Sequence, residues 1–334
     1  MFIVSNYYQA ILFCVITMIC WGSWANTQKM NQNKWRFELF YWDYVIGILI
    51  FSIISALTMG SIGEQGRPFI EDIAQTNSTN ILNALLSGTI FNLANILLTA
   101  AIAAAGMAVA FPIGIGIALV AGVFFNYLIH EKGDPTLLFA GVFLVTIAII
   151  LNAIAYKKHK GQTAATSIKK WITISVIAGL LMSLFYPFLA SGMDLSNFEN
   201  PAKGKMTPYT AFVIFSIGIF ISNLFFNTIL MRHPLEGKPI QYKDYFKGHF
   251  NNHIYGILGG AIWGIGNLFN LIAAGKAGPA ISYGLGQGAT LIAALWGVLV
   301  WKEFKNANKS VNSLLVAMFC SFIIGLALII WSGS

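Results

Sequence analysis

The chain has 334 residues, of which 57% are hydrophobic and 10% charged, and its formal net charge is +8. Soluble domains carry about 25% charged residues, and a soluble fold could not keep this much apolar sequence away from water. The composition therefore excludes an ordinary soluble enzyme and a disordered chain, and it indicates a polytopic membrane protein. The cysteines, Cys14, Cys20 and Cys320, all lie in apolar runs, which excludes a secreted disulfide scaffold.

Ten apolar stretches are each long enough to cross a bilayer as a helix, which takes about 20 mostly apolar residues. A helix satisfies its own backbone groups in lipid, whereas the strands of a membrane barrel would alternate polar and apolar residues. We therefore predict an all-α protein with ten transmembrane helices. In chain order the stretches are 7–27, 39–60, 81–104, 108–129, 136–156, 171–192, 209–231, 254–274, 278–301 and 311–331.

The basic residues are distributed unevenly over the loops between these stretches. Fifteen of the twenty Lys and Arg residues follow odd-numbered helices, and five follow even-numbered ones. Because cytoplasmic loops are enriched in Lys and Arg, we expect the odd-numbered loops in the cytoplasm and both termini outside. This distribution accounts for the basic charge without a nucleic-acid partner. The first residues lack a basic segment and a cleavage site, so no cleavable signal is expected and the cytoplasmic (inner) membrane is the favoured location.

An internal repeat is the most specific signal in the sequence. The stretch from Ser87 to Glu131 matches the stretch from Gly259 to Glu303 without a gap, at an offset of 172 residues. The matched segments are five helices apart, so they must have opposite orientations in the membrane. We predict an inverted 5+5 repeat: 1–156 is the first half, 157–170 a cytoplasmic basic linker and 171–334 the second half. The most informative matches are Gly88 with Gly260, Asn95 with Asn267, Gly106 with Gly278, Gly114 with Gly286, Gly116 with Gly288, and Glu131 with Glu303.

Inverted repeats recur in secondary transporters, which bind substrate near the midplane between the two halves. Two such halves can exchange conformations, and the exchange converts an outward opening into an inward one. The chain has no G-x-x-x-x-G-K-[ST] phosphate loop, so ATP hydrolysis within this polypeptide is not expected. An enzyme would need a nucleophile with a base, a carboxylate pair or metal ligands at depth. The pattern favours a transporter without a cofactor over an enzyme.

Three segments resemble a known family: CWGSWANTQK at Cys20–Lys29, FELFYWDYVIGILIFSIISALTMGSIG at Phe37–Gly63, and GLGQGATLIAALWGVLVWKEF at Gly284–Phe304. With the number and order of helices, they resemble the drug/metabolite transporter superfamily, and within it the glucose/ribose porters and plant ureide permeases. The resemblance implies import of a small neutral metabolite, first of all a monosaccharide such as glucose or ribose. A ureide or nucleobase-type carrier and a small-molecule efflux transporter are alternatives within transport, and an intramembrane receptor or enzyme is the alternative outside it.

Polar and aromatic side chains inside the predicted helices are the candidates for binding such a substrate. Asn95 and Asn267 are repeat partners near mid-helix, and carboxamides both donate and accept hydrogen bonds, which suits sugar hydroxyls or ureide amides. Each candidate could instead pack between helices or bond a neighbouring helix. The predicted substrate-binding residues are Asn95, Asn267, Trp263, Gln287, Phe91, Tyr283, Tyr186, Asn92, Asn270, Asn223 and Trp24.

Asp43 lies about one turn into the second predicted helix, and an acid within the membrane is a functional candidate by default. We expect it to couple transport to protons; the alternative is an interfacial acid that pairs with Lys34 or Arg36. His249 and His253 are four residues apart in a predicted polar loop with no third ligand, so no metal site is expected.

Proline and glycine inside the helices mark positions where backbones approach closely or where a helix is loosened. Glu131 and Glu303 end the repeat-related fourth and ninth helices, where they serve either as gate charges or as plain helix-end charges. The predicted hinge or packing residues are Pro112, Gly114, Gly116, Gly284, Gly286, Gly288 and Pro187.

Overall fold

The computed structural model describes residues 1–31, 35–105, 107–160 and 165–334, and within these ranges it is built of helices without a strand. Ten helical spans in the described residues are long and apolar enough to cross a membrane. The prediction of an all-α protein with ten transmembrane helices is therefore confirmed. The helices are α1 Tyr7–Ser23, α2 Ala25–Asn31, α3 Phe37–Leu57, α4 Phe69–Gln75, α5 Ser78–Ala105, α6 Met107–Ile129, α7 Pro135–Lys160, α8 Ala165–Ser191, α9 Pro208–Arg232, α10 Tyr242–Tyr245, α11 Phe250–Ala277, α12 Pro279–Gln287, α13 Ala289–Leu295, the π-helix η1 Trp296–Val300, and α14 Lys309–Trp331.

Two of the ten spans are interrupted. The first span consists of α1 and α2, which meet at Trp24, and the ninth consists of α12, α13 and η1, with the first break at Gly288. The sequence predicts a single span in each place, with Gly288 of the ninth among the hinge or packing positions; it does not predict the break at Trp24. Gly106 and residues 161–164 lie outside the described residues; α7 reaches Lys160 and α8 starts at Ala165, so the described part of the predicted linker belongs to helix ends.

The helix starts follow from local sequence. The side chain of Asn6 accepts a hydrogen bond from the Gln9 backbone N–H at the start of α1, and Asn308 does the same for Val311 at the start of α14. Thr207 caps α9, whose first residue is Pro208. Asn and Thr satisfy backbone donors that the first turn leaves unpaired, and proline at the first helical position lacks such a donor.

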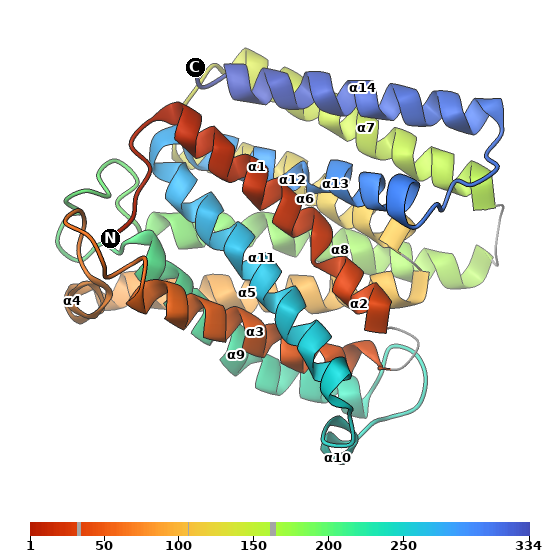
Figure 1. Cartoon of the computed structure of the whole chain (residues 1–334), viewed down its shortest axis with the longest axis horizontal. Helices are drawn as coiled ribbons and strands as arrows, with labels where there is room; N and C mark the ends of the chain where they lie inside the picture. The colour runs from red at the N-terminus through yellow and green to blue at the C-terminus, as the bar shows by residue number, and fades with distance from the viewer. Residues whose placement is uncertain (32–34, 106, 161–164) are drawn as a thin grey trace.

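Both termini lie at one end of the helix bundle, and α2 and α10 lie at the other (Figure 1). We call the first the terminal end; it holds residues 1–6, 58–77, 192–207 and 332–334, which are joined by backbone hydrogen bonds such as that from Phe2 to Met59 and that from Asn77 to Gly204. We call the second the basic end; it holds residues 25–31, 35–38, 232–249 and 301–309.

The repeat-related helices α5 and α11 occupy the middle of the bundle and run in opposite directions. The first turn of α5 bonds the loop 192–207 at the terminal end, where Asn80 donates to the Gly204 carbonyl at 2.7 Å. The last turn of α11 meets the same loop, where Lys276 lies 4.0 Å from Glu199. The helix α5 therefore starts at the end of the molecule where α11 finishes.

Close backbone contacts through glycine hold the central helices together. A Cβ atom on Gly88 of α5 would lie 2.1 Å from the Phe215 carbonyl oxygen of α9, and one on Gly260 of α11 would lie 2.0 Å from the Tyr44 carbonyl oxygen of α3. Small residues let membrane helices approach in this way. At the edge of the bundle, α7 and α14 lie side by side (Figure 1) and touch at Gly141 and Gly325.

Candidate functional site

Phe91 of α5 and Trp263 of α11, which are repeat partners, meet in the middle of the bundle. Their ring centroids are 4.4 Å apart, and Trp263 is also stacked at 6.0 Å on Trp21 of α1, with the two ring planes only 9° apart. Phe215 of α9 lies on another side of Trp263, at 6.1 Å. Four helices thus contribute to one aromatic cluster at mid-bundle.

A cavity lies beside this cluster, and we call it the central cavity. Five of the predicted substrate-binding residues line it. Every lining residue is at most 8% exposed, so its walls are buried within the helix bundle. Its lining carries carboxamides and indole rings but no charged side chain. The lining residues are Trp21, Trp24, Phe91, Asn95, Leu98, Phe111, Ile115, Met182, Phe185, Trp263, Gln287 and Ala289.

Asn95 and Gln287 are the carboxamides of the central cavity. The Asn95 amide donates to the Tyr41 hydroxyl at 3.2 Å, and that hydroxyl donates in turn to the Asn92 carbonyl at 3.4 Å. This chain of bonds fixes the orientation of Asn95. Gln287 is the last residue of α12, directly before the helix break at Gly288. Both side chains combine a donor and an acceptor, and together they can bond a neutral substrate edge that has both.

Asn267 lies one helical turn beyond Trp263 and is fully buried, outside the lining of the central cavity. Neither its amide nitrogen nor its amide oxygen has a hydrogen-bond partner in the described part of the chain, and the same is true of Asn223 on α9. A buried polar group without a partner costs roughly 1–3 kcal/mol. These two carboxamides therefore remain available for a ligand, a water molecule or a rearranged partner.

Four other predicted binding residues bond neighbouring helices. Asn92 donates to the Ser222 hydroxyl at 3.0 Å, and Asn270 donates to the Ser282 carbonyl at 2.7 Å. Tyr186 lies 3.2 Å from the Ser282 hydroxyl, and Tyr283 donates to the Met182 carbonyl at 3.2 Å. None of these four side chains is among the residues that line the central cavity.

Two of the predicted hinge or packing glycines pack against α1. A Cβ atom on Gly286 would lie 2.8 Å from the Trp21 ring, and one on Gly288 would lie 2.8 Å from the Met18 sulfur. The other positions lie within helices: Pro112, Gly114 and Gly116 in α6, Pro187 in α8 and Gly284 in α12.

Asp43 is 1% exposed and has two polar partners that the sequence did not indicate. The Tyr245 hydroxyl of α10 donates a short hydrogen bond to it, and His253 Nδ1 of α11 lies 3.0 Å from each carboxylate oxygen. Burial and the neighbouring Asp43 carboxylate raise the pKa of Tyr245, which keeps this phenol protonated as a donor. The trio joins three elements at the basic end.

The alternative interpretation, in which Asp43 pairs with Arg36, is wrong, because the Arg36 guanidinium pairs with Glu38 instead. Lys34, the other partner considered, lies outside the described residues. The prediction that His249 and His253 lie in a loop is also wrong. His249 is the N-cap of α11 and His253 lies in its first turn. The missed signal is the helical start at HFNNH, where the Asn252 side-chain oxygen accepts a hydrogen bond from the His249 backbone N–H.

A second cavity has Lys29, Trp301 and Glu303 of the basic end in its lining. Phe111 lines both this cavity and the central cavity. Lys29 of α2 and Glu303 form an ion pair in the lining of the second cavity, and the Lys29 ammonium lies 4.4 Å from the centroid of the Trp301 ring. Glu303 is thus one member of a specific pair, whereas its repeat partner Glu131 is exposed.

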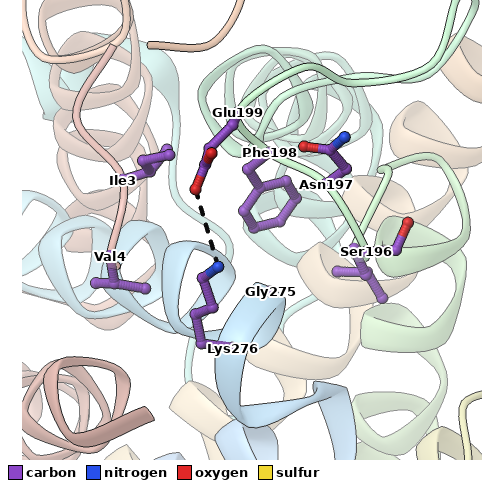
Figure 2. Close-up of a pocket in the computed structure, with 9 residues that line it drawn as sticks. Ile3, Val4, Ser196, Asn197, Phe198, Glu199, Gly275 and Lys276 are labelled. Carbon is purple, nitrogen blue, oxygen red and sulfur yellow. Dashed lines mark ion pairs between the residues drawn. The ribbon is translucent and has the colours of Figure 1, made fainter. Parts of the chain in front are cut away.

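The loop 192–207 covers the terminal end. Figure 2 shows Phe198 and Glu199 of this loop beside the N-terminal residues Ile3 and Val4, with Lys276 of α11 directed at Glu199. The distance between the Lys276 and Glu199 charges is 4.0 Å, and about half of each side chain is exposed.

Comparison with known proteins identifies the family. The family model for ureide permeases matches residues 40–171 and 162–332. The chain belongs to the ureide permease family. It is 24% identical to ureide permease 1 of Arabidopsis thaliana over 387 aligned residues, which cover 100% of this chain and 99% of that protein. Ureide permease 2 of the same plant is 25% identical, again over 100% and 99% of the two chains.

Two further similarities agree with this family assignment. The glucose uptake protein GlcU of Bacillus subtilis is 26% identical over 68% of this chain and 69% of its own. A solved crystal structure has the same fold, with a TM-score of 0.60 over 97% of this chain at 14% sequence identity. This member of the ureide permease family is an integral membrane protein and a transporter of small metabolites.

Proposed function

We propose that this protein is a secondary active transporter that imports a small neutral polar metabolite through the central cavity. The observation that carries the proposal is the composition of that cavity, which combines indole rings with two carboxamides and has no charged lining residue. An anionic substrate would be expected to meet a buried Arg or Lys, and a purely apolar substrate would make no use of the carboxamides of Asn95 and Gln287. A neutral substrate with both donors and acceptors suits all of these groups.

Of the two substrate classes that the sequence left open, we now favour ureides over monosaccharides. The ureide permeases of Arabidopsis thaliana align over the whole chain, whereas the glucose uptake protein aligns over about two thirds of it. A ureide presents N–H and C=O groups in one plane. Such an edge can pair with carboxamides, and its flat face can lie on the indole rings of Trp21 and Trp263.

Two features support alternating access between inverted halves. The repeat partners α5 and α11 run in opposite directions, and the close contact of Gly88 with Phe215 is mirrored by the contact of Gly260 with Tyr44. Gly88 and Gly260 are 172 residues apart in the sequence. Their contact partners, Tyr44 and Phe215, are 171 residues apart, which is close to the repeat offset of 172. Equivalent contacts in both halves would let each half take the conformation of the other, which is the exchange that transport needs.

The distribution of Lys and Arg supports placing the basic end in the cytoplasm, with both termini outside. Asp43 then lies near the cytoplasmic surface, bonded to His253 and Tyr245. We propose proton symport through this group, because its carboxylate is buried and its neighbours can share a proton. An efflux pump for apolar compounds is disfavoured by the polar lining of the central cavity.

The test is uptake into right-side-out membrane vesicles that contain the protein. Labelled allantoin and labelled glucose are compared, with uracil and ribose as competitors, in the presence and absence of an inward proton gradient. We expect saturable allantoin uptake that the gradient accelerates and that glucose does not compete away. Uptake of glucose but not allantoin would restore the monosaccharide interpretation, and uptake of neither would contradict the proposal.

A further inference from the structure

The short helix α2 makes many polar contacts, and its Thr27 also packs against Gly259 of α11. It has seven residues, and five of their side chains make hydrogen bonds or ion pairs: Asn26, Thr27, Gln28, Lys29 and Asn31. Side-chain bonds of this kind are individually weak between membrane helices, at about 0.6 kcal/mol. Contacts of this strength can be broken one at a time at a small cost in free energy.

These bonds connect α2 to three other parts of the basic end. The Trp301 indole donates to the Asn26 amide oxygen at 2.7 Å, and Lys29 pairs with Glu303 just beyond it. The Gln28 amide donates to the Thr99 carbonyl of α5 at 3.3 Å. Asn31 and Asn252 of α11 exchange two hydrogen bonds of 2.8 Å. The helix therefore bridges the elements that surround the basic end of the central cavity.

The junction between α1 and α2 is built as a break in the helix. The Thr27 hydroxyl donates to the Trp24 carbonyl at 2.7 Å, and the Asn26 amide donates to the Ser23 carbonyl at 2.9 Å. Side chains thus satisfy carbonyls at the point where the helix is interrupted, a recurrent cause of bends in helices. The segment that α2 contacts through Trp301 and Glu303 is irregular as well. It begins with the π-helix η1, and Lys302 has a left-handed backbone with φ of 51°.

The position of α2 is that of a plug between the central cavity and the basic end. Trp24, at its start, lines the central cavity, and Lys29, one and a half turns later, lines the second cavity. Gln28 lines a third pocket on another side of α2. Moving α2 away from Trp301 and Glu303 would open the second cavity toward the basic end, and Phe111 lines both that cavity and the central cavity.

We propose that α2 is the gate at the basic end: it pivots at Trp24, and it opens when the contacts of Asn26 with Trp301 and of Lys29 with Glu303 break. The side chains of Lys29 and Glu303 are 35% and 20% exposed, so water can hydrate both charges once they separate. The gate rests on the proposed function, since it is one of the two closures that alternating access requires.

The experiment measures access to the second cavity and needs neither a substrate nor uptake. Cys14, Cys20 and Cys320 are replaced by alanine, and Thr290→Cys places a thiol in the lining of the second cavity. A membrane-impermeant methanethiosulfonate reagent is applied to each face of oriented vesicles. Lys238→Cys, an exposed position at the basic end, identifies the face to which that end is open.

We expect slow labelling of Thr290→Cys in this background and labelling about tenfold faster when Glu303→Gln or Lys29→Met is added, because the open state gains population. The exchanged pair Lys29→Glu with Glu303→Lys restores slow labelling. Asn26→Ala removes the partner of Trp301 without changing charge, and it also accelerates labelling on the same face. Glu199→Gln, which breaks the ion pair at the terminal end, leaves the rate within about twofold.

Unchanged labelling in Glu303→Gln, Lys29→Met and Asn26→Ala would overturn the gate, and so would fast labelling in the exchanged pair. Acceleration from the face of the terminal end would overturn it as well. A failure of the vesicles to take up allantoin would contradict the proposed substrate but would leave these labelling rates unaffected, so the two proposals can fail separately.

Discussion

The two ends of the molecule are closed in different ways. At the basic end, Lys29 and Glu303 join a seven-residue helix to an irregular segment, and both charges are partly exposed. At the terminal end, the fully buried Asp72 of α4 receives Arg67 at 2.9 Å and the Thr207 backbone N–H at 2.8 Å. The comparison teaches that an ion pair in contact with water can open and close, whereas a buried one that also bonds the backbone anchors the fold.

The largest effect, on the free energy of unfolding, should come from removing the buried Asp72 carboxylate at the terminal end. Asp72→Ala leaves the Arg67 charge and the Thr207 N–H without their partner, so we expect the free energy of unfolding to fall by about 3 kcal/mol. Thermal unfolding of the detergent-purified protein measures this loss. Asp244→Ala, at an exposed site of the basic end, is the matched control and should change the melting temperature much less. Equal effects of the two substitutions would remove the distinction between the ends.

Substrate uptake through the central cavity, which lies between the two ends, should depend on Trp263. Trp263→Ala deletes a ring that contacts Trp21, Phe91 and Phe215, and we expect allantoin uptake to fall about a hundredfold. Trp263→Phe keeps an aromatic face and should lose about tenfold. Trp331→Ala, at a 61% exposed position on α14, should leave uptake unchanged. Normal uptake by a folded Trp263→Ala protein would place the substrate elsewhere.

The Asp43 carboxylate near the basic end should determine whether uptake is coupled to the proton gradient. Asn cannot release and rebind a proton as a carboxylate does, so in Asp43→Asn an inward proton gradient should no longer accelerate uptake. Exchange of labelled for unlabelled substrate across the membrane should continue. Asp134→Asn, which retains a suitable N-cap for α7 at the terminal end, should keep the full response to the gradient. A response that survives in Asp43→Asn would exclude this residue as the proton carrier.

The smallest effect is expected at the exposed pair of the terminal end. Glu199→Gln removes an ion pair with a separation of 4.0 Å, and we expect uptake to change by less than about twofold. Glu303→Gln should alter uptake more strongly, because it shifts the position of α2. Initial uptake rates of the two variants, normalised to the amount of folded protein, measure the difference. A larger effect of Glu199→Gln would reverse the roles of the two ends.

Part of the candidate site could be predicted, because the hydrophobic pattern and the internal repeat indicate which polar and aromatic residues lie near the middle of a helix. Asn95, Phe91, Trp263, Gln287 and Trp24 were all predicted, and all five line the central cavity. Trp21 was missed, although it precedes Trp24 by three residues and therefore shares its side of a helix. The burial of Asn267 outside the cavity lining was not predictable, because the rotation of α11 depends on its packing against α1 and α3.

The partners of Asp43 also could not be predicted from the sequence. The carboxylate could be recognised as costly in a membrane segment, and nearby Arg36 was a reasonable partner on the basis of sequence distance. The observed partners, Tyr245 and His253, are about 200 residues away along the chain. Only the tertiary structure, which places Tyr245 of α10 and His253 of α11 beside α3, brings them within hydrogen-bond distance.

The sequence by itself determined the ten membrane spans, because about 20 apolar residues in lipid have to form a helix that satisfies its own backbone. It also determined the residue types available for binding. The tertiary structure alone decided which charges meet and which polar side chains bond across helices. Those outcomes depend on side chains such as Asn26 and Glu303 finding partners on distant helices, and the hydropathy of a single segment carries no information about them.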